Sequence, residues 1–129
     1  MRLKKAVADL IECERVCRVA TSGKAAVPHL VPVCHVLSGG KIYFAAEKNA
    51  RKVRNLRANP RIAVAVDLYS DAWSNLRGVM VQGKAAIIGK SPRFRKIRGL
   101  LSSSSRRSDG SPRAPRIGRG RLRPRRRSP

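Results

Sequence analysis

The sequence is short of acidic and aromatic residues. Only seven of its 129 residues are Asp or Glu, against 30 Lys and Arg, and aromatic residues make up 4%. It has three cysteines, none of them in a C-x-x-C pair, and two histidines. These shortages argue against a disulfide framework, a zinc site and a nucleic-acid reader that stacks bases on aromatic rings. We therefore expect reduced, mostly buried thiols and no metal centre.

Long apolar runs are also missing. No segment approaches the roughly 18 apolar residues of a membrane-spanning helix. Acids interrupt the opening MRLKKAVADLIECERV, which therefore does not resemble a secretory signal. With 129 residues and 42% hydrophobic content, the chain is long enough for one domain with a modest core. We expect a cytoplasmic protein that does not associate with a membrane.

The positive charge divides the chain into two parts. The formal net charge is +23, of which residues 91–129 contribute +13 and residues 1–90 contribute +10. From residue 102 onward, 24 of the 28 residues are Arg, Ser, Pro or Gly, and none is Lys. Such a segment cannot bury enough apolar area to offset the entropy cost of ordering it. The composition predicts a folded domain over 1–101 and a disordered tail over 102–129.

Hydrophobic periodicity in the first part predicts a mainly β fold with flanking helices. Apolar residues at helical spacing predict an amphipathic helix over 2–13, and a shorter helix is expected over 50–58. Runs rich in β-branched residues predict five strands, the first three forming a meander, over 16–22, 27–37, 41–46, 61–69 and 77–88. Five strands and a small connecting helix favour a small β-barrel or a strongly twisted sheet that helices partly close.

The short helix has cations at an unfavourable end. In EKNARKVRNLRANP, Asn49 is a suitable N-cap and Pro60 follows the helix, yet Arg51 and Lys52 stand in the first turn. Cations there oppose the helix dipole, whereas an anion would satisfy both the dipole and the side chains. The segment is therefore a candidate phosphate site. The alternative is a solvated basic face that Arg54, Arg57 and Arg61 continue.

Four segments in this order resemble the flavin-binding split-barrel family, which includes the pyridoxamine 5′-phosphate oxidase-like proteins and their deazaflavin-using relatives. They are VATSG, PHLVPVCHVLSGGKIYFAAE, ARKVRNLRANPRIAVAVD and WSNLRGVMVQGKA, and the resemblance covers about residues 10–100. It implies a split β-barrel and a homodimeric oxidoreductase that uses FMN or a deazaflavin on a small-molecule substrate. The family's final strand is not found after RFRKIRGLL, so we expect a barrel that is incomplete at its C-terminus.

The resemblance also implies a set of cofactor-binding residues. In the family, the Arg51–Lys52 pair would hold the cofactor phosphate, and the backbone of the second strand would follow the ring edge. Pro32 is consistent with such an edge, because it lacks the N–H that a central strand needs. The full implied set is Leu30, Val31, Pro32, Val33, Cys34 and His35 on the second strand, Ala45 and Ala46 on the third, Arg51 and Lys52, and Trp73, Ser74 and Arg77 where a second subunit or the following strand reaches the cofactor.

No catalytic residue is assigned, because the cofactor carries the redox chemistry in such a fold. His35 is the one candidate for proton transfer, but an apolar strand position is more typical of a structural histidine. FMN is the expected cofactor and the deazaflavin coenzyme is the alternative. Leu30 replaces an arginine that the oxidase proper usually has, and the extra cations at Lys48, Arg54 and Arg57 suit a longer anionic tail.

The arginine-rich tail leaves two explanations open. It could bind nucleic acid without sequence preference by neutralising phosphates. It could also be a frameshift product, because Arg, Ser, Pro and Gly without Lys are what a GC-rich coding strand yields when it is read out of frame. One permitted back-translation of LLSSSSRRSDGS gives LLEFPQIRRE in another frame, which is similar to the family's continuation. The tail has no histidine, which disfavours pyridoxamine phosphate oxidation itself.

Overall fold

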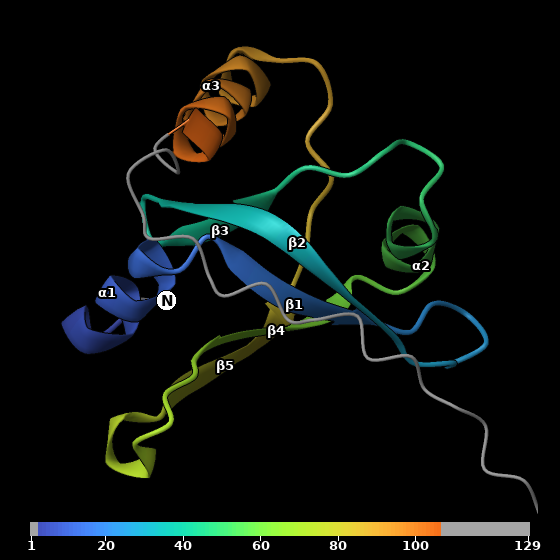
Figure 1. The fold of residues 1–129 in the computed structure, drawn as a ribbon. Coiled ribbons are helices and arrows are strands. Elements are labelled where there is room, and N and C mark those ends of the chain that lie inside the picture. The colour runs from blue at the N-terminus through green and yellow to red at the C-terminus, as the bar shows by residue number, and fades with distance from the viewer. Residues whose placement is uncertain (1–2, 107–129) are drawn as a thin grey trace, which may run out of the picture.

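The computed structural model describes residues 3–106, which form a five-stranded antiparallel sheet with flanking helices (Figure 1). The elements in chain order are α1 (Lys5–Cys13), β1 (Val16–Thr21), β2 (His29–Ser38), β3 (Lys41–Phe44), α2 (Arg51–Ala58), β4 (Arg61–Leu68), the 3-10 helix η1 (Trp73–Asn75), β5 (Arg77–Lys84) and α3 (Pro92–Arg106). The predicted mainly β fold class is confirmed.

The strands lie in the order β3-β2-β1-β4-β5, and the sheet curls into a half-barrel. The first three strands form the predicted meander, and β4 joins it by pairing with β1. Figure 1 shows α1 and α3 on either side of β2, while α2 lies at the end of the sheet where β1 ends and β2 begins. No helix within residues 3–106 is long and apolar enough to cross a membrane.

The core forms where α1 covers one face of the sheet. Alternate residues of the strands point to this face, and five side chains bury almost completely: Ile11, Cys17, Val19, Val64 and Val66. Partly buried residues of α1, β2, β3, β4 and β5 pack around them. None of the buried residues of the described chain is Lys, Arg, Asp or Glu. Removing this apolar surface from water is the main force that holds the half-barrel together.

Several element boundaries differ from the predicted ones. The strand expected over 41–46 ends at Phe44, because its ladder with β2 ends at the pair His35–Phe44. The helix expected from residue 50 begins at Arg51 and has Ala50, not Asn49, at its N-cap position. Helix α3 continues to Arg106, so residues 102–106 belong to it although composition assigned them to the tail. The rest of the predicted tail lies outside the described residues.

Side-chain hydrogen bonds fix α2 to the end of β1. Asn55 donates from Nδ2 to Oγ1 of Thr21 at 3.1 Å, and Asn59 donates from Nδ2 to Oγ of Ser22 at 3.2 Å. Gly23 follows with a positive φ of 66°, and a Cβ at this position would lie 2.5 Å from Oδ1 of Asn55. The close approach therefore needs a glycine. These contacts hold the middle and the end of α2 beside the end of β1, which pairs with the start of β2.

The three cysteines differ in their burial. Cys17 is completely buried in the core, whereas Cys13 and Cys34 are exposed. The prediction of mostly buried thiols is therefore wrong for two of the three, although all three are free. Loss of solvation raises the pKa of Cys17 from its ordinary value of 9.0 to about 11. The unfolded chain would thus lose this proton at a lower pH than the folded chain.

We expect only Cys13 and Cys34 to react quickly with a thiol reagent at pH 8, because the Cys17 thiol is buried and protonated. Thiol counting before and after denaturation measures this, and three fast thiols in the folded protein would contradict it.

The raised pKa also predicts that the contribution of Cys17 to stability is complete below about pH 9 and is lost as the pH rises toward 11. A Cys17→Ala variant should lack this part of the decline.

Candidate functional site

Strand β2 changes its partner halfway along its length and leaves one edge open. Its residues His29–Cys34 pair with β1, and its residues His35–Ser38 pair with β3. Within residues 3–106, no strand lies on the other side of the first half. The amide of His35 donates to the carbonyl of Arg15 at 3.0 Å, which marks that position as a hydrogen-bonded pair of the β1–β2 ladder.

This alternation decides which backbone groups of β2 are free. In an antiparallel ladder, hydrogen-bonded pairs alternate with pairs that point their N–H and C=O groups outward. Counting back from His35, the outward positions are Leu30, Pro32 and Cys34. Pro32 therefore gives up no ladder bond, which agrees with the edge position predicted for it. The open edge, defined as Leu30–Cys34, offers N–H groups at Leu30 and Cys34 and carbonyls at all three outward positions.

The side chains of the open edge also alternate. Val31 and Val33 point toward the core, and Leu30, Pro32 and Cys34 are exposed on the opposite face. Leu30 is 66% exposed, which is high for a leucine on a strand. The edge thus combines free polar backbone groups with an apolar, solvent-facing surface, and a flat ligand with polar rim atoms could use both.

His35, which the resemblance included in the site, is a core residue instead. It is 3% exposed, and its Nε2 lies 2.7 Å from the carbonyl oxygen of Ile11, to which it must donate because a carbonyl only accepts. The amide is bonded to Arg15, and the residue pairs with Phe44 on the other side. His35 ties α1 to the sheet and presents no group at the open edge. This geometry agrees with the structural role that sequence analysis favoured over proton transfer.

Ala45 and Ala46 lie beyond β3 and not on it. Extending the β2–β3 register by one residue would place Ala45 opposite Cys34, but the ladder ends one pair earlier. Both alanines are exposed and begin the segment that leads to α2. They therefore continue the line of the open edge toward that helix.

Helix α2 begins without a capping side chain. Ala50 occupies the N-cap position and makes no side-chain hydrogen bond, and the first turn holds no acid. The first N–H groups of any helix have no carbonyl partner within it, so those of Arg51 and Lys52 remain available. Arg51 is exposed and Lys52 is half-buried. Two cations and two free amides therefore meet at one point, which suits an anion such as phosphate.

A charged pair that sequence analysis missed lies beside the open edge. Arg18 stands opposite Pro32 across the β1–β2 ladder and forms an ion pair with Asp67 of β4. It is the only ion pair within residues 3–106. The signal was present in the sequence, because Arg18 and Asp67 occupy outward positions of their strands and carry opposite charges.

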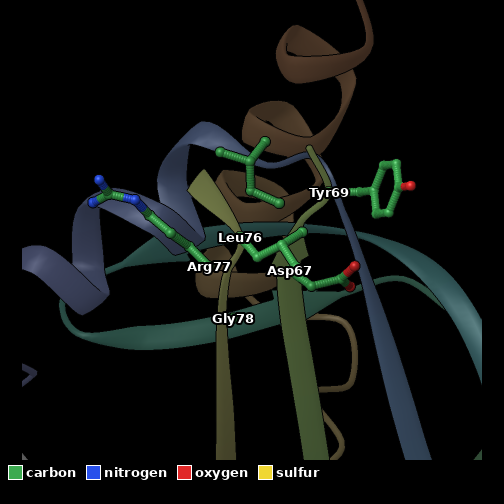
Figure 2. Close-up of a pocket in the computed structure, with 6 residues that line it drawn as sticks. Asp67, Tyr69, Leu76, Arg77 and Gly78 are labelled. Atoms are coloured by element: carbon green, nitrogen blue, oxygen red, sulfur yellow. The ribbon is translucent and has the colours of Figure 1, made fainter. Parts of the chain in front are cut away.

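The remaining predicted residues lie at the far end of the sheet. Trp73 and Ser74 belong to η1, which joins β4 to β5, and Arg77 begins β5. Trp73 is 84% exposed and Tyr69 is 75% exposed. A shallow hollow beside them is lined by Asp67, Leu68, Tyr69, Leu76, Arg77 and Gly78. Figure 2 shows that Asp67 and Tyr69 point to one side of it and Arg77 to the other, so its polar groups do not converge on a ligand.

The structure therefore brings together only part of the predicted site. The open edge begins next to His29, which pairs with Thr21, and Thr21 accepts a hydrogen bond from Asn55 of α2. Ala45 and Ala46 begin the segment that leads to the same helix. Strand β4 then runs the eight residues from Arg61 to Leu68 before the chain reaches η1. At about 3.3 Å per residue this separates Trp73 from α2 by roughly 25 Å. One chain alone does not assemble all thirteen predicted residues.

Comparison with known proteins identifies related sequences and folds. The sequence model of a protein family described as "Pyridoxamine 5′-phosphate oxidase" matches residues 3–125. The matched range thus includes most of the arginine-rich tail. No curated protein sequence matches the chain.

Solved structures share the fold. A conserved hypothetical protein from Mycobacterium tuberculosis is 25% identical with a TM-score of 0.70, and the match covers 78% of this chain and 63% of that protein. An FAD-binding protein from Mesorhizobium loti is 22% identical with a TM-score of 0.67, covering 85% and 81% of the two chains. HutZ, the heme storage protein from Vibrio cholerae, is 15% identical with a TM-score of 0.68, covering 81% and 76%.

Proposed function

The chain belongs to the pyridoxamine 5′-phosphate oxidase family, and from this premise we propose that it is a flavin- or deazaflavin-dependent oxidoreductase that acts on a small-molecule substrate. The observation that carries the proposal is the position of the open edge of β2 next to the uncapped, cationic start of α2. The open edge would hold the flat ring of a flavin, and the start of α2 would hold its phosphate.

The phosphate end of the cofactor fits α2. Its negative charge would replace the missing acid in the first turn and would accept hydrogen bonds from the free amides of Arg51 and Lys52. The two side chains would add charge-assisted bonds. Hydrogen bonds from Asn55 to Thr21 and from Asn59 to Ser22 position the helix before a ligand binds. Preorganisation of this kind lowers the entropy cost of binding.

The ring end fits the open edge. A flavin ring presents a row of hydrogen-bond acceptors and one N–H along its polar rim, and the outward groups of Leu30, Pro32 and Cys34 include both donors and acceptors. The exposed side chains of these residues provide the apolar surface that a flat ring needs. Arg18 adds a cation on the same face, and Asp67 fixes its position.

When bound, the cofactor supplies the hydride or electron transfer. The chain's own residues bind and orient it and exclude water from one side of the ring. His35 is buried and bonded to Ile11, so it takes no part in proton transfer at the ring. The substrate remains unassigned beyond a small molecule that reaches the open face of the ring.

FMN and the deazaflavin coenzyme remain the two proposed cofactors. Arg54 and Arg57 of α2 are exposed and form no ion pair within the described chain, so they are available to a longer anionic tail. FMN, with one phosphate, would leave them in solvent. We retain FMN as the named cofactor and the deazaflavin as the alternative.

We expect the double variant Arg51→Ala/Lys52→Ala to bind FMN at least tenfold more weakly. Each lost bond to a charged group costs about 1.5 to 3 kcal/mol, and about 1.4 kcal/mol corresponds to a factor of ten in Kd. Fluorescence titration with FMN, FAD and the deazaflavin measures the loss for each cofactor. The variant Arg54→Ala/Arg57→Ala has the same net charge and serves as the matched control.

The control variant also separates the two cofactors. If FMN is the ligand, Arg54→Ala/Arg57→Ala should change its Kd little, whereas a longer anionic tail would be weakened by both double variants. Bound cofactor should further slow thiol labelling of Cys34 on the open edge but not of Cys13 on α1. Equal affinity of all variants for every cofactor, with no protection of Cys34, would contradict the proposed site.

We also propose that the protein acts as a homodimer. Trp73, Ser74 and Arg77 lie too far from α2 to reach a cofactor in the same chain. A two-fold axis can place the tip of one subunit, which we define as residues 69–77 from the end of β4 to the start of β5, beside the open edge of the other. The tip exposes Tyr69 and Trp73, and such aromatic surfaces are frequent at protein interfaces. The dimer would thus complete the site.

The single tryptophan reports on this assembly. We expect sedimentation at micromolar concentration to give about twice the chain mass of 14.2 kDa. Emission of Trp73 should move to longer wavelength on dilution, because the residue returns to water. Trp73→Ala should weaken the dimer, and Ile87→Ala, which changes another exposed apolar residue, should not. A folded monomer that binds cofactor fully would disprove the dimer.

A further inference from the structure

The second half of the chain contains a long stretch without acidic residues. No Asp or Glu occurs from residue 72 to residue 106, and α3 lies at the end of this stretch. Four cations of α3 are exposed to solvent: Arg93, Arg95, Lys96 and Arg98. The only ion pair within residues 3–106 is Arg18–Asp67, so none of the four is neutralised by a described carboxylate. This charge is not used by the proposed cofactor site.

The packing of α3 determines which side of it is free. Ile97 is 8% exposed and α3 contacts β2, so the helix is held to the sheet by its apolar side. At 100° per residue, Arg95 lies about 160° from Ile97 and Arg98 about 100° from it, and the two neighbour each other at a spacing of three. The small residues Gly99, Ser102 and Ser103 follow on this side, and the two serine hydroxyls donate to the carbonyls of Arg98 and Gly99. The outer side of α3 is therefore cationic and free of bulky side chains.

We propose that this outer side of α3 is a nucleic-acid-binding surface that contacts the phosphate backbone without reading sequence. A phosphate backbone supplies closely spaced negative charges that an acid-free helix can neutralise. The sequence beyond α3 adds nine arginines and one acid over residues 107–129, so the positive charge continues along the chain. The surface offers no aromatic ring for base stacking on its outer side, and binding therefore depends on charge alone.

Nucleic acid fits this surface better than an anionic membrane does. A helix that lies on a membrane inserts its apolar side between the lipids. In α3 that side is already packed on β2 through Ile97, which leaves Phe94 and Leu100 partly exposed at 37% and 39%. The side that remains available carries charge and small polar residues. This inference does not depend on the proposed oxidoreductase activity.

The test compares two variants of the full chain that lose the same charge. Arg95→Gln/Arg98→Gln removes the outer cations of α3, and Lys4→Gln/Lys5→Gln removes two exposed cations at the start of α1. Binding of a labelled 20-base-pair DNA duplex is measured by fluorescence anisotropy from 50 to 200 mM salt. For the α3 variant, the slope of log K against log salt should fall by up to about 1.8, since each phosphate contact contributes about 0.9. The α1 variant should keep the slope of the unaltered protein.

Four outcomes would overturn the proposal. An equal loss of slope in both variants would show attraction by net charge and not by α3. No change in either variant would show that α3 makes no phosphate contact. Tighter binding to phosphatidylserine vesicles than to the duplex, with the same dependence on Arg95 and Arg98, would assign the surface to a membrane. Equal affinity for two duplexes of different sequence is expected, and a large preference would contradict backbone binding. Circular dichroism of each variant confirms that it is folded.

Discussion

Pro32 has no backbone N–H, and the arrangement of β2 depends on that missing donor. A proline in the middle of a sheet would leave a carbonyl of the neighbouring strand without its partner. Here the outward position of Pro32 in the β1–β2 ladder avoids this cost, and β3 pairs with β2 only beyond Cys34. The same residue therefore allows the strand to form and keeps its first half free on one side. The candidate site exists because the ladder stops there.

Charge is distributed in keeping with this geometry. No Lys, Arg, Asp or Glu is buried among the described residues, so the core imposes no desolvation cost on charged groups. At the start of α2, Arg51 and Lys52 occupy positions where acids would stabilise the helix. In the sheet, Arg61 stands directly opposite Lys84, where like charges repel. A bound anion would reduce the repulsion in both arrangements. The folded chain therefore has unfavourable electrostatic interactions that a ligand or salt can compensate.

The sequence predicted the elements well because their periodicity is strong and local. All five predicted strands are present, and none extends more than one residue beyond its predicted range. Pro32 by itself indicated that β2 has a free edge. Strand alternation places His35 on the core face, and its bond to Ile11 is a long-range contact that periodicity does not reveal. The distance between α2 and Trp73 was equally hidden, since only the fold shows that β4 carries the chain away. Asn49 was displaced as cap because the chain turns one residue later than its capping preference suggests.

The core joins the two ends of a long stretch of chain. Ile11 of α1 packs with Val66 of β4, and the partly buried residues around them reach as far as Val79 and Val81 of β5. During synthesis the amphipathic α1 must therefore wait with its apolar side uncovered until β5 has left the ribosome, and this long delay exposes it to aggregation or to chaperones. Once Val81 has emerged the core can close, before α3 itself has left the ribosome. The five buried residues of the core thus all precede α3 in the chain, and α3 adds its contact with β2 through Ile97 afterwards.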